Sequence, residues 1–372
     1  MHNRSVKLIA FSADKETPGV SKKLNDQSVA LMNLGYSVTV RKLGFTSKFN
    51  GFRYLRSILA AKENVIFLRL SPNFFFNFFL WIPLIVCRIR GQIVLIDVPT
   101  PLHIGIREVI NSGFSLFHKI YYSVTIIVAF PWVVIPANKI LVYAPERYHF
   151  SWIIRKKTKL IGNGINLDEI PLIKMKSSRS SKSKIELVGV GIINTYHGFD
   201  RIIKSMAERI QTDDSKDKNF NNTRIKFHII GNGPALNSLK QLVDELDLAE
   251  FVNFVGPLYG DSLFTFLGTM DVGIASLAGF RVGLTDNSDL KSRMYLGCGL
   301  PIVQSIPDLD IPSASEFVFC VPDNNDPIDL DGLASWYYQE EFWLKGPEIR
   351  EYAERNLTYT SKMRDVMADI CD

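Results

Sequence analysis

The chain has 372 residues, and 47% of them are apolar, so it can form two hydrophobic cores and is not a largely disordered protein. Its net charge of +5 is unevenly divided, because residues 1–170 carry 22 basic and 9 acidic side chains, whereas the remainder carries 21 and 29. We therefore expect two domains with different partners, an anionic surface or acceptor facing the basic half. Nucleic acid is not expected, because the sequence holds no motif of a nucleic-acid-binding fold.

The cysteines and the first residues bear on the compartment. No two cysteines are close enough in sequence to indicate a zinc site or a disulfide framework, which fits a reducing environment; they are Cys87, Cys298, Cys320 and Cys371. Met1 to Lys7 lacks the charged-then-apolar pattern of a signal peptide. We expect a cytoplasmic protein, peripheral on the inner face of the membrane where it makes membrane contact.

The first half alternates short β-rich runs with helical segments, which is typical of parallel α/β folding. A turn at Pro18-Gly19 precedes an expected helix from Ser21 to Leu34. The expected strands are Val6–Phe11, Ser37–Arg41, Val65–Leu70, Ile93–Asp97, Ile140–Tyr143 and Lys159–Ile161.

Two apolar stretches, Phe74–Cys87 and Ile120–Pro136, are borderline for a spanning helix, which needs ~20 mainly apolar residues. They are either buried helices of an α/β domain or helices lying on a bilayer surface. The second interpretation draws on flanking basic residues, which are Arg53, Arg56, Arg88, Arg90 and Lys119.

A Ser-rich basic segment, Lys174–Lys184, indicates a linker, and the α/β alternation restarts after it. The expected strands of the second half are Ile185–Val190, Lys226–Ile230, Phe251–Val255, Asp271–Ala275 and Pro301–Val303. A helix is expected at His197–Ile210 and a charged helical tail at Ile349–Ile370. Because ligands of open α/β sheets bind at the carboxyl ends of strands, the loops after these strands are the places to look for a site.

The segment Gly231-Asn232-Gly233-Pro234 follows a strand and precedes a helix. Glycines there let backbone approach a phosphate, and the helix offers free amide donors. The alternative is a plain turn. The dinucleotide pattern, with its later acidic residue, is missing, which argues against a dehydrogenase.

His197 and Arg201 stand four residues apart at the start of an expected helix, on one face. A cationic pair beside helix amides suits a pyrophosphate. Alternatively, Arg201 pairs with a surface carboxylate.

The segment Thr285–Pro301 begins with polar residues and a helix cap and then presents two cations, Lys291 and Arg293. Its carboxylates, Asp286 and Asp289, could bind a sugar while the cations bind its phosphate.

Four segments in consistent order, "NGINLDEI", "GVGIINTYHGFDRII", "HIIGNGPALNSLKQLVDELDLAEFVNFVG" and "DLKSRMYLGCGLPIV", resemble the C-terminal domain of GT-B glycosyltransferases. The branch they resemble is the large retaining family, family 4-like, that includes sucrose synthases and bacterial polysaccharide enzymes. The resemblance covers residues 158–305. It implies an α/β, GT-B fold of two facing Rossmann-like domains with a C-terminal helical tail.

The implied domain organisation has four parts. Residues 1–165 form an acceptor-side Rossmann-like domain, and 166–184 a hinge and Ser/Lys-rich linker. Residues 185–345 form the nucleotide-sugar-binding domain, and 346–372 a tail that packs on the first domain.

The resemblance also implies roles for single residues. His197 would contact the donor pyrophosphate, and Gly231 and Gly233 would line the nucleotide pocket. Lys291 and Arg293 match the cations of an "LKxR" motif, with Arg201 and Asp289 as further donor-binding residues. Asp286 matches the first of two acidic positions and would be catalytic. The second position, which holds the ribose in relatives, is Met294, so ribose recognition falls to another residue such as Asp289 or activity is lost.

We therefore expect a hexosyl-type, retaining transferase of capsule, O-antigen or exopolysaccharide synthesis, which uses a nucleotide-sugar donor and a lipid-linked or saccharide acceptor. No cofactor or metal is expected, because His197, Arg201 and Lys291 could stabilise the leaving group, and Asp308-Leu309-Asp310 resembles a metal motif by chance. His103 is a second catalytic candidate or a plain loop residue. The alternatives are a non-catalytic sugar-nucleotide-binding partner and an epimerase of the same fold.

Overall fold

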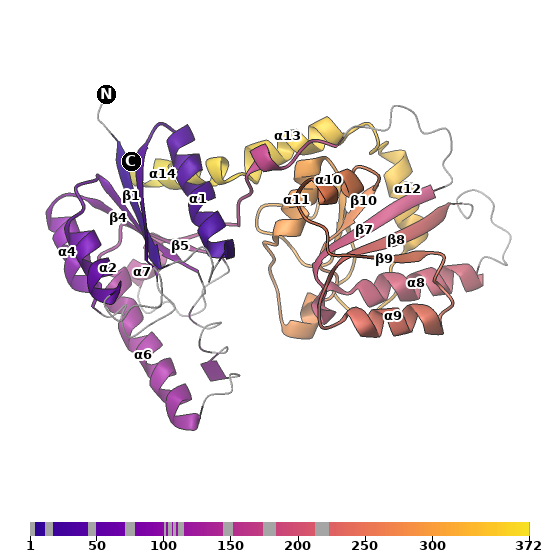
Figure 1. Cartoon of the computed structure of the whole chain (residues 1–372), viewed down its shortest axis with the longest axis horizontal. Helices are drawn as coiled ribbons and strands as arrows, with labels where there is room; N and C mark the ends of the chain where they lie inside the picture. Colours follow the sequence, from indigo (N-terminus) through magenta and orange to yellow (C-terminus); the bar gives the residue numbers. More distant parts are fainter. Residues whose placement is uncertain are drawn as a thin grey trace. The chain divides into compact units, whose positions relative to one another are not determined.

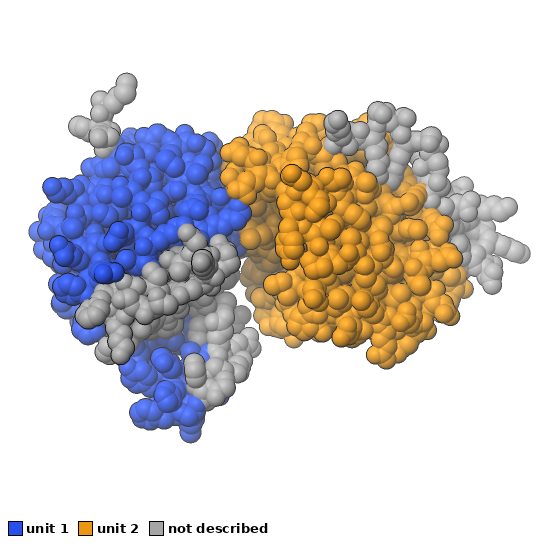
Figure 2. All heavy atoms as spheres, in the orientation of Figure 1, with its two compact units in different colours: residues 1–163, 359–372 blue, residues 164–358 orange. Residues whose placement is uncertain are grey.

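The structure is a computed structural model that describes residues 4–11, 18–43, 50–70, 79–99, 102, 106, 109–110, 115–143, 152–173, 184–212 and 223–371. The chain forms two compact units (Figure 2). Unit 1 comprises Met1–Asn163 with Tyr359–Asp372, and unit 2 comprises Gly164–Thr358. Each unit contains a six-stranded parallel sheet, which confirms the expected α/β architecture.

The sheet of unit 1 has the strand order β2-β1-β3-β4-β5-β6. Its inner strands are buried on both faces, which explains their unbroken runs of Val, Ile and Leu. The strands are β1 Ser5–Phe11, β2 Ser37–Leu43, β3 Val65–Arg69, β4 Ile93–Val98, β5 Lys139–Val142 and β6 Thr158–Leu160.

Helices cover both faces of this sheet (Figure 1). Helices α1 (Pro18–Asn33) and α14 (Tyr359–Cys371) pack on one face, where Leu31 and Met363 share a core. The helices of the other face share the second core; they are α2 (Asn50–Leu59), α4 (Trp81–Ile89) and α6 (Leu116–Val134). A short helix, α7 (Trp152–Lys157), precedes β6.

The sheet of unit 2 has the order β12-β11-β10-β7-β8-β9. Its strands are β7 Lys184–Ile192, β8 Arg224–Asn232, β9 Val252–Gly256, β10 Val272–Ile274, β11 Ile302–Gln304 and β12 Val318–Cys320. Its α-helices are α8 Phe199–Thr212, α9 Leu236–Glu245, α10 Gly260–Leu267, α11 Leu290–Cys298, α12 Leu330–Gln339 and α13 Gly346–Asn356, with 3₁₀ turns η1 Leu167–Glu169, η2 Thr195–His197 and η3 Gly279–Val282.

In the sheet of unit 2, the side on which successive strands are added changes at β7, although all strands are parallel. From β7 the chain proceeds outward to β8 and β9, and then returns to the other side of β7 for β10, β11 and β12. The loops after β7 and β10 therefore separate from each other, and in doubly wound sheets this switch point is where ligands bind.

The segments that join the units differ from the expected ranges. Residues 164–165, expected in the first domain, and residues 166–173, expected in the hinge and linker, pack into unit 2, where Ile165 and Ile170 join its core. Arg350 of α13 donates to the carbonyls of Leu167, Ile170 and Gly297. The expected single tail is divided: α13 belongs to unit 2, whereas α14 packs on α1 in unit 1.

Candidate functional site

The carboxyl ends of β7 and β8 approach each other closely. In the strand register Gly191 lies opposite Gly231, and a Cβ on Gly231 would lie 1.9 Å from the carbonyl oxygen of Gly191. A Cβ on Gly233 would lie 2.4 Å from Ile193 N. Both glycines are therefore needed for this backbone contact, and their backbone forms the wall beside the loop after β7.

His197 lies in that loop, at the end of η2, and is buried. Its carbonyl accepts from Leu277 N in the loop after β10, at 3.0 Å, which joins the two loops of the switch point. Gly198 follows in the left-handed region, where a Cβ would lie 2.9 Å from Leu277. The turn between η2 and α8 thus requires glycine, and it fixes the His197 ring.

The His197 ring is a neutral hydrogen-bond donor. Its Nδ1 accepts from the backbone N–H of Asn194 at 3.3 Å, so the ring proton is on Nε2. Burial, reinforced by the nearby ammonium of Lys291, lowers the pKa of His197 to about 3. At neutral pH the ring therefore offers Nε2–H to a ligand without carrying a charge.

Lys291 places a largely buried ammonium near Asp289, its ion-pair partner, without a hydrogen bond to it. Its side chain is only 10% exposed, and within the described part of the chain its Nζ has no hydrogen-bond partner. Asp289 Oδ2 lies 4.0 Å from Nζ, beyond hydrogen-bond distance. Burial lowers the pKa of Lys291 to about 8, against the opposing effect of Asp289. A buried ammonium without an acceptor is costly, so the geometry indicates an anionic ligand.

An aromatic ring joins these two groups. The Phe199 ring stacks on His197 with centroids 5.3 Å apart, and Lys291 Nζ lies 5.6 Å from its centroid. Phe199 occupies the space that a side chain at Gly189 would need, since a Cβ there would lie 2.5 Å from the ring. On the other side, Tyr295 Oη accepts from Val190 N at 2.8 Å and ties α11 to β7.

Asp289 has a structural role as the N-cap of α11. Its Oδ1 accepts from Ser292 N at 2.9 Å and its Oδ2 from Asn287 Nδ2 at 3.0 Å. Burial alone would raise the pKa of Asp289, but Lys291 and these hydrogen bonds hold it below the ordinary value. The carboxylate therefore stays charged and orients Lys291, and both of its oxygens are already engaged.

Arg201 does not form the expected cationic pair with His197. Its guanidinium is buried and donates to the carbonyls of Leu277, Pro322 and Asp326, so it braces loops of unit 2. In the part of the chain that the structure describes, its acceptors are carbonyl and amide oxygens and not the surface carboxylate of the alternative interpretation. The i, i+4 argument failed because the left-handed Gly198 places His197 outside α8.

Arg293 also differs from its expected role. It is fully buried and donates to Asp308 at 2.8 and 3.0 Å and to Asp310 at 2.6 Å. Asp308 and Asp310, which had no role in the sequence analysis, are thus the anchors of Arg293. This cluster positions the segment before α11, where Asn287 forms a β-bridge with Asp308.

Asp286 and Met294 lie on either side of Lys291 in the sequence. Asp286 is half-buried before α11, and its Oδ2 accepts from Thr285 Oγ1 at 2.9 Å. Met294 is half-buried and packs against the core of unit 2. Leu290 and Met294 share a face of α11 and make this face apolar. His103 lies outside the described residues.

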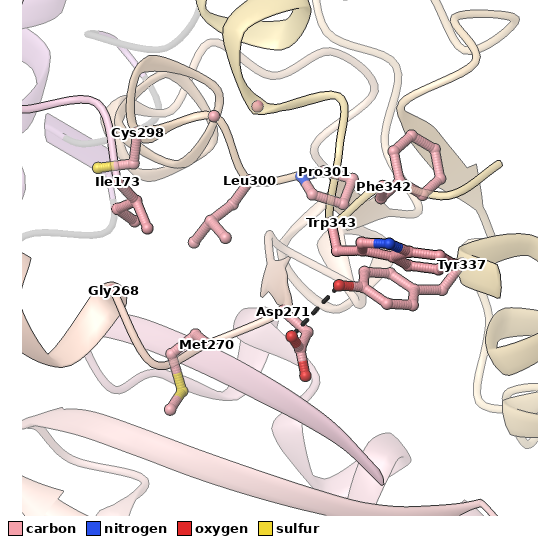
Figure 3. A pocket seen from close by; sticks show the side chains of 12 residues that line it. Ile173, Gly268, Met270, Asp271, Cys298, Leu300, Pro301, Tyr337, Phe342 and Trp343 are labelled. Carbon is pink, nitrogen blue, oxygen red and sulfur yellow. Dashed lines mark hydrogen bonds between the residues drawn. The ribbon is translucent and has the colours of Figure 1, made fainter. Parts of the chain in front are cut away.

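Two cavities of unit 2 are distinct from this cluster. One, of about 40 Å³, lies at the amino ends of β10 and β11, where Tyr337 Oη donates to Asp271 at 3.2 Å (Figure 3). It is too small for a sugar nucleotide. The other, of about 300 Å³, lies between α8 and α9 and shares Asn194 and Phe199 with the loop after β7, although His197 and Lys291 do not line it.

Comparisons with known proteins support the fold. No family model matches the sequence, and a search of curated proteins finds no match to it. Sucrose-phosphate synthase from Thermosynechococcus elongatus has a similar structure, with a TM-score of 0.56, 15% identity and 99% of both chains covered. The chain has the GT-B fold.

Other structures with the GT-B fold agree. The lipopolysaccharide outer core galactosyltransferase WaaB has a TM-score of 0.56 at 11% identity, over 98% of this chain and 99% of that one. The catalytic domain of starch synthase IV from Arabidopsis thaliana, bound to ADP and acarbose, has a TM-score of 0.55 at 11% identity, over 99% and 98%. The fold class inferred from the sequence is confirmed.

Proposed function

We propose that this protein is a hexosyl-type glycosyltransferase that binds a nucleotide-sugar donor at the switch point of unit 2 and transfers the sugar to an acceptor hydroxyl. One observation carries the proposal: Lys291 places a buried ammonium without a hydrogen-bond partner beside the neutral donor His197. A diphosphate supplies the negative oxygens that both groups need. The structural neighbour bound to ADP is consistent with a ligand of this class.

The two groups have complementary roles in the reaction. As the bond between the sugar and the diphosphate breaks, negative charge grows on the leaving oxygen. Lys291 stabilises that charge as a cation, and His197 Nε2–H donates a hydrogen bond to the diphosphate. Both groups are held in place beforehand, Lys291 by Asp289 and His197 by Asn194.

The finer assignment is a retaining, metal-independent transferase of capsule, O-antigen or exopolysaccharide synthesis, with a saccharide or lipid-linked acceptor, in the cytoplasm. It rests on the resemblance of residues 158–305 to the retaining family. Its metal independence is supported by Asp308 and Asp310, whose carboxylates already bind Arg293.

The donor site is tested by measuring the thermal stabilisation of the full chain by UDP-, GDP-, ADP- and CMP-sugars. We expect one of these nucleotides to raise Tm, and the Lys291→Met variant to lose that shift because the diphosphate loses its cation. Lys240→Met, which removes an exposed lysine of α9, is the matched control and should retain it. A full shift in Lys291→Met would overturn the proposal.

A second function, a non-catalytic sugar-nucleotide-binding partner, is favoured by the apolar Leu290 and Met294 face. The variant Met294→Glu separates the two functions. A large gain in sugar transfer would indicate a degenerate enzyme, whereas an active parent protein without such a gain would indicate a rebuilt ribose site.

A further inference from the structure

The first half of this inference concerns the exposed face of α6. Large apolar side chains on this face are exposed along the whole helix, at the spacing of three and four residues that forms one stripe. They are Phe117, Ile120, Tyr121, Val124, Ile127, Val128, Trp132 and, just beyond the helix, Ile135. We call these residues the α6 stripe. Figure 1 shows α6 projecting from the described body of unit 1.

The opposite face of α6 determines how the helix can be used. Ile126, Phe130, Val133 and Val134 are buried in the core of unit 1. The helix is long and apolar enough to cross a membrane, yet only 28% of its most apolar window is buried. If α6 spanned a bilayer, its buried residues would have to leave the core of unit 1. The helix is therefore suited to lie along an apolar surface with only its stripe embedded.

Neighbouring elements extend the stripe with the residues typical of a membrane interface. The Trp81 ring of α4 lies 6.0 Å from that of Trp132, and Ile82, Ile85 and Ile89 of α4 are exposed. On α7, Trp152 is exposed and the Lys156 ammonium lies 3.9 Å from its ring centroid. Tryptophan beside lysine or arginine is the composition that favours the headgroup region.

The positive charge of this surface favours an anionic partner. Helices α4, α6 and α7 contain five lysines and arginines and no aspartate or glutamate; they are Arg88, Lys119, Arg155, Lys156 and Lys157, and Arg90 follows α4 directly. Lys157 donates to the carbonyl of Ile135, so basic charge lies at the end of the stripe itself. A second copy of the chain would bring cation against cation, whereas anionic lipid supplies both an apolar interior and negative headgroups.

We propose that α6, with the exposed residues of α4 and α7, is a docking surface for an anionic phospholipid bilayer, in which α6 lies in the interface plane. This inference is independent of the donor site in unit 2. It gives unit 1 a binding partner and places it where a lipid-borne acceptor would be found.

The experiment is co-sedimentation of the full chain with phosphatidylcholine vesicles that contain or lack about 30 mol% phosphatidylglycerol. We expect binding to the anionic vesicles at low salt, weakened at about 0.5 M NaCl because surface charges are screened. The double variant Val124→Glu/Val128→Glu, at two positions that are each 52% exposed, should reduce partitioning at least about tenfold, because charge is costly among lipid chains.

Two controls keep the result specific. Leu344→Glu places the same charge on a residue of unit 2 that is 53% exposed, and it should bind like the parent protein. Arg155→Gln/Lys156→Gln should reduce the preference for anionic vesicles. If the stripe variant does not fold, brominated lipid should quench part of the parental tryptophan emission, because Trp81, Trp132 and Trp152 belong to the proposed surface whereas Trp336 and Trp343 lie in unit 2.

Three outcomes would overturn the inference: no binding at low salt, unchanged binding of the folded stripe variant, or no quenching. A parent protein that is dimeric, ignores vesicles and becomes monomeric in the stripe variant would assign the stripe to an interface between copies. Donor binding measured on the same samples separates these outcomes from a failure of the proposed function, since the stripe lies in unit 1 and Lys291 in unit 2.

Discussion

At the scale of single residues, Lys291 combines a cost to the stability of the fold with its proposed role in donor binding. Its buried ammonium has no hydrogen-bond acceptor among the residues that the structure describes, so the folded protein tolerates it at the expense of stability. Removing a ligand-binding charge of this kind stabilises a protein while it abolishes binding. Arg201 and Arg293 differ, because their N–H donors are bound within the fold. Their substitution should therefore lower the stability of the protein.

The first prediction concerns Lys291 and pH. The folded-state pKa of about 8 lies below the ordinary 10.5, so the folded chain binds fewer protons than the unfolded chain between these values. The Lys291 contribution therefore makes stability rise with pH through that window. Donor affinity should fall over the same range, as the ammonium loses its proton.

Two measurements check this prediction. Lys291→Met should raise the unliganded stability at pH 7, by on the order of 2 kcal/mol, and should flatten its rise between pH 8 and 10.5. Lys240→Met should change neither. Donor affinity that is constant from pH 7 to pH 9.5 would contradict the role of Lys291. His197 should not contribute to pH dependence near neutrality, because its pKa is about 3.

The second prediction concerns Arg293. Arg293→Met leaves Asp308 buried without its cation, so we expect a loss of about 3–5 kcal/mol in the free energy of unfolding. Chemical denaturation measures this loss. A change below about 1 kcal/mol would contradict the structural role and make Arg293 a candidate for ligand binding again. The buried arginine was not recognisable from the sequence, because its partners Asp308 and Asp310 follow an intervening strand.

At the scale of elements, the sequence located most strands to within a residue or two. The expected strand Val6–Phe11 is β1 at Ser5–Phe11, because a buried parallel strand has a continuous apolar run. Strand β12, Val318–Cys320, was not anticipated, since three residues are too few to show a period. The expected helix His197–Ile210 begins instead at Phe199, after the left-handed turn at Gly198.

The C-terminal tail shows where local pattern fails. Its helical periodicity from Ile349 to Ile370 is continuous, yet the helix is interrupted between the end of α13 and the start of α14. At the break Thr358 forms a parallel bridge with Ile165, and Leu357 accepts a hydrogen bond from Ile165 N. Both interactions depend on a partner almost 200 positions away in sequence, which no helical pattern reveals.

The third prediction concerns α14. Met363 is fully buried between α14 and the core of unit 1, so Met363→Ala should cost about 2–5 kcal/mol. Arg364→Ala, at the exposed neighbouring position, should change stability by less than about 0.5 kcal/mol. Equal effects in thermal unfolding would show that α14 is not part of this core.

At the scale of the whole molecule, the sequence predicted the two α/β units, and the proposed donor site lies at the strand ends where the sequence led us to look. Of the candidate residues that the sequence offered, His197 and Lys291 lie on the same aromatic ring, that of Phe199, and both remain in the proposed site. The sequence could not identify Phe199, Asn194 or Tyr295, because their roles arise from contacts between loops that only the folded sheet brings together. The docking surface proposed on α6 also required the structure, which separates the buried from the exposed face of one apolar run.

The fourth prediction concerns metal ions. Because Asp308 and Asp310 are bound to Arg293, we expect sugar transfer to persist in excess chelator. The measurement is product formation with and without chelator. Complete loss that a divalent cation restores would show that the reaction requires a metal.

The position of α14 has a consequence for the order in which the protein forms during synthesis. Domains generally fold as their residues leave the ribosome, the first before the second. Here one face of unit 1 stays uncovered until Tyr359–Cys371 has been made, after all of unit 2. Unit 2 is continuous in sequence and can finish first. The nascent chain therefore carries an incomplete, basic unit 1 throughout the translation of unit 2, and that interval is when it most needs a chaperone or a membrane surface.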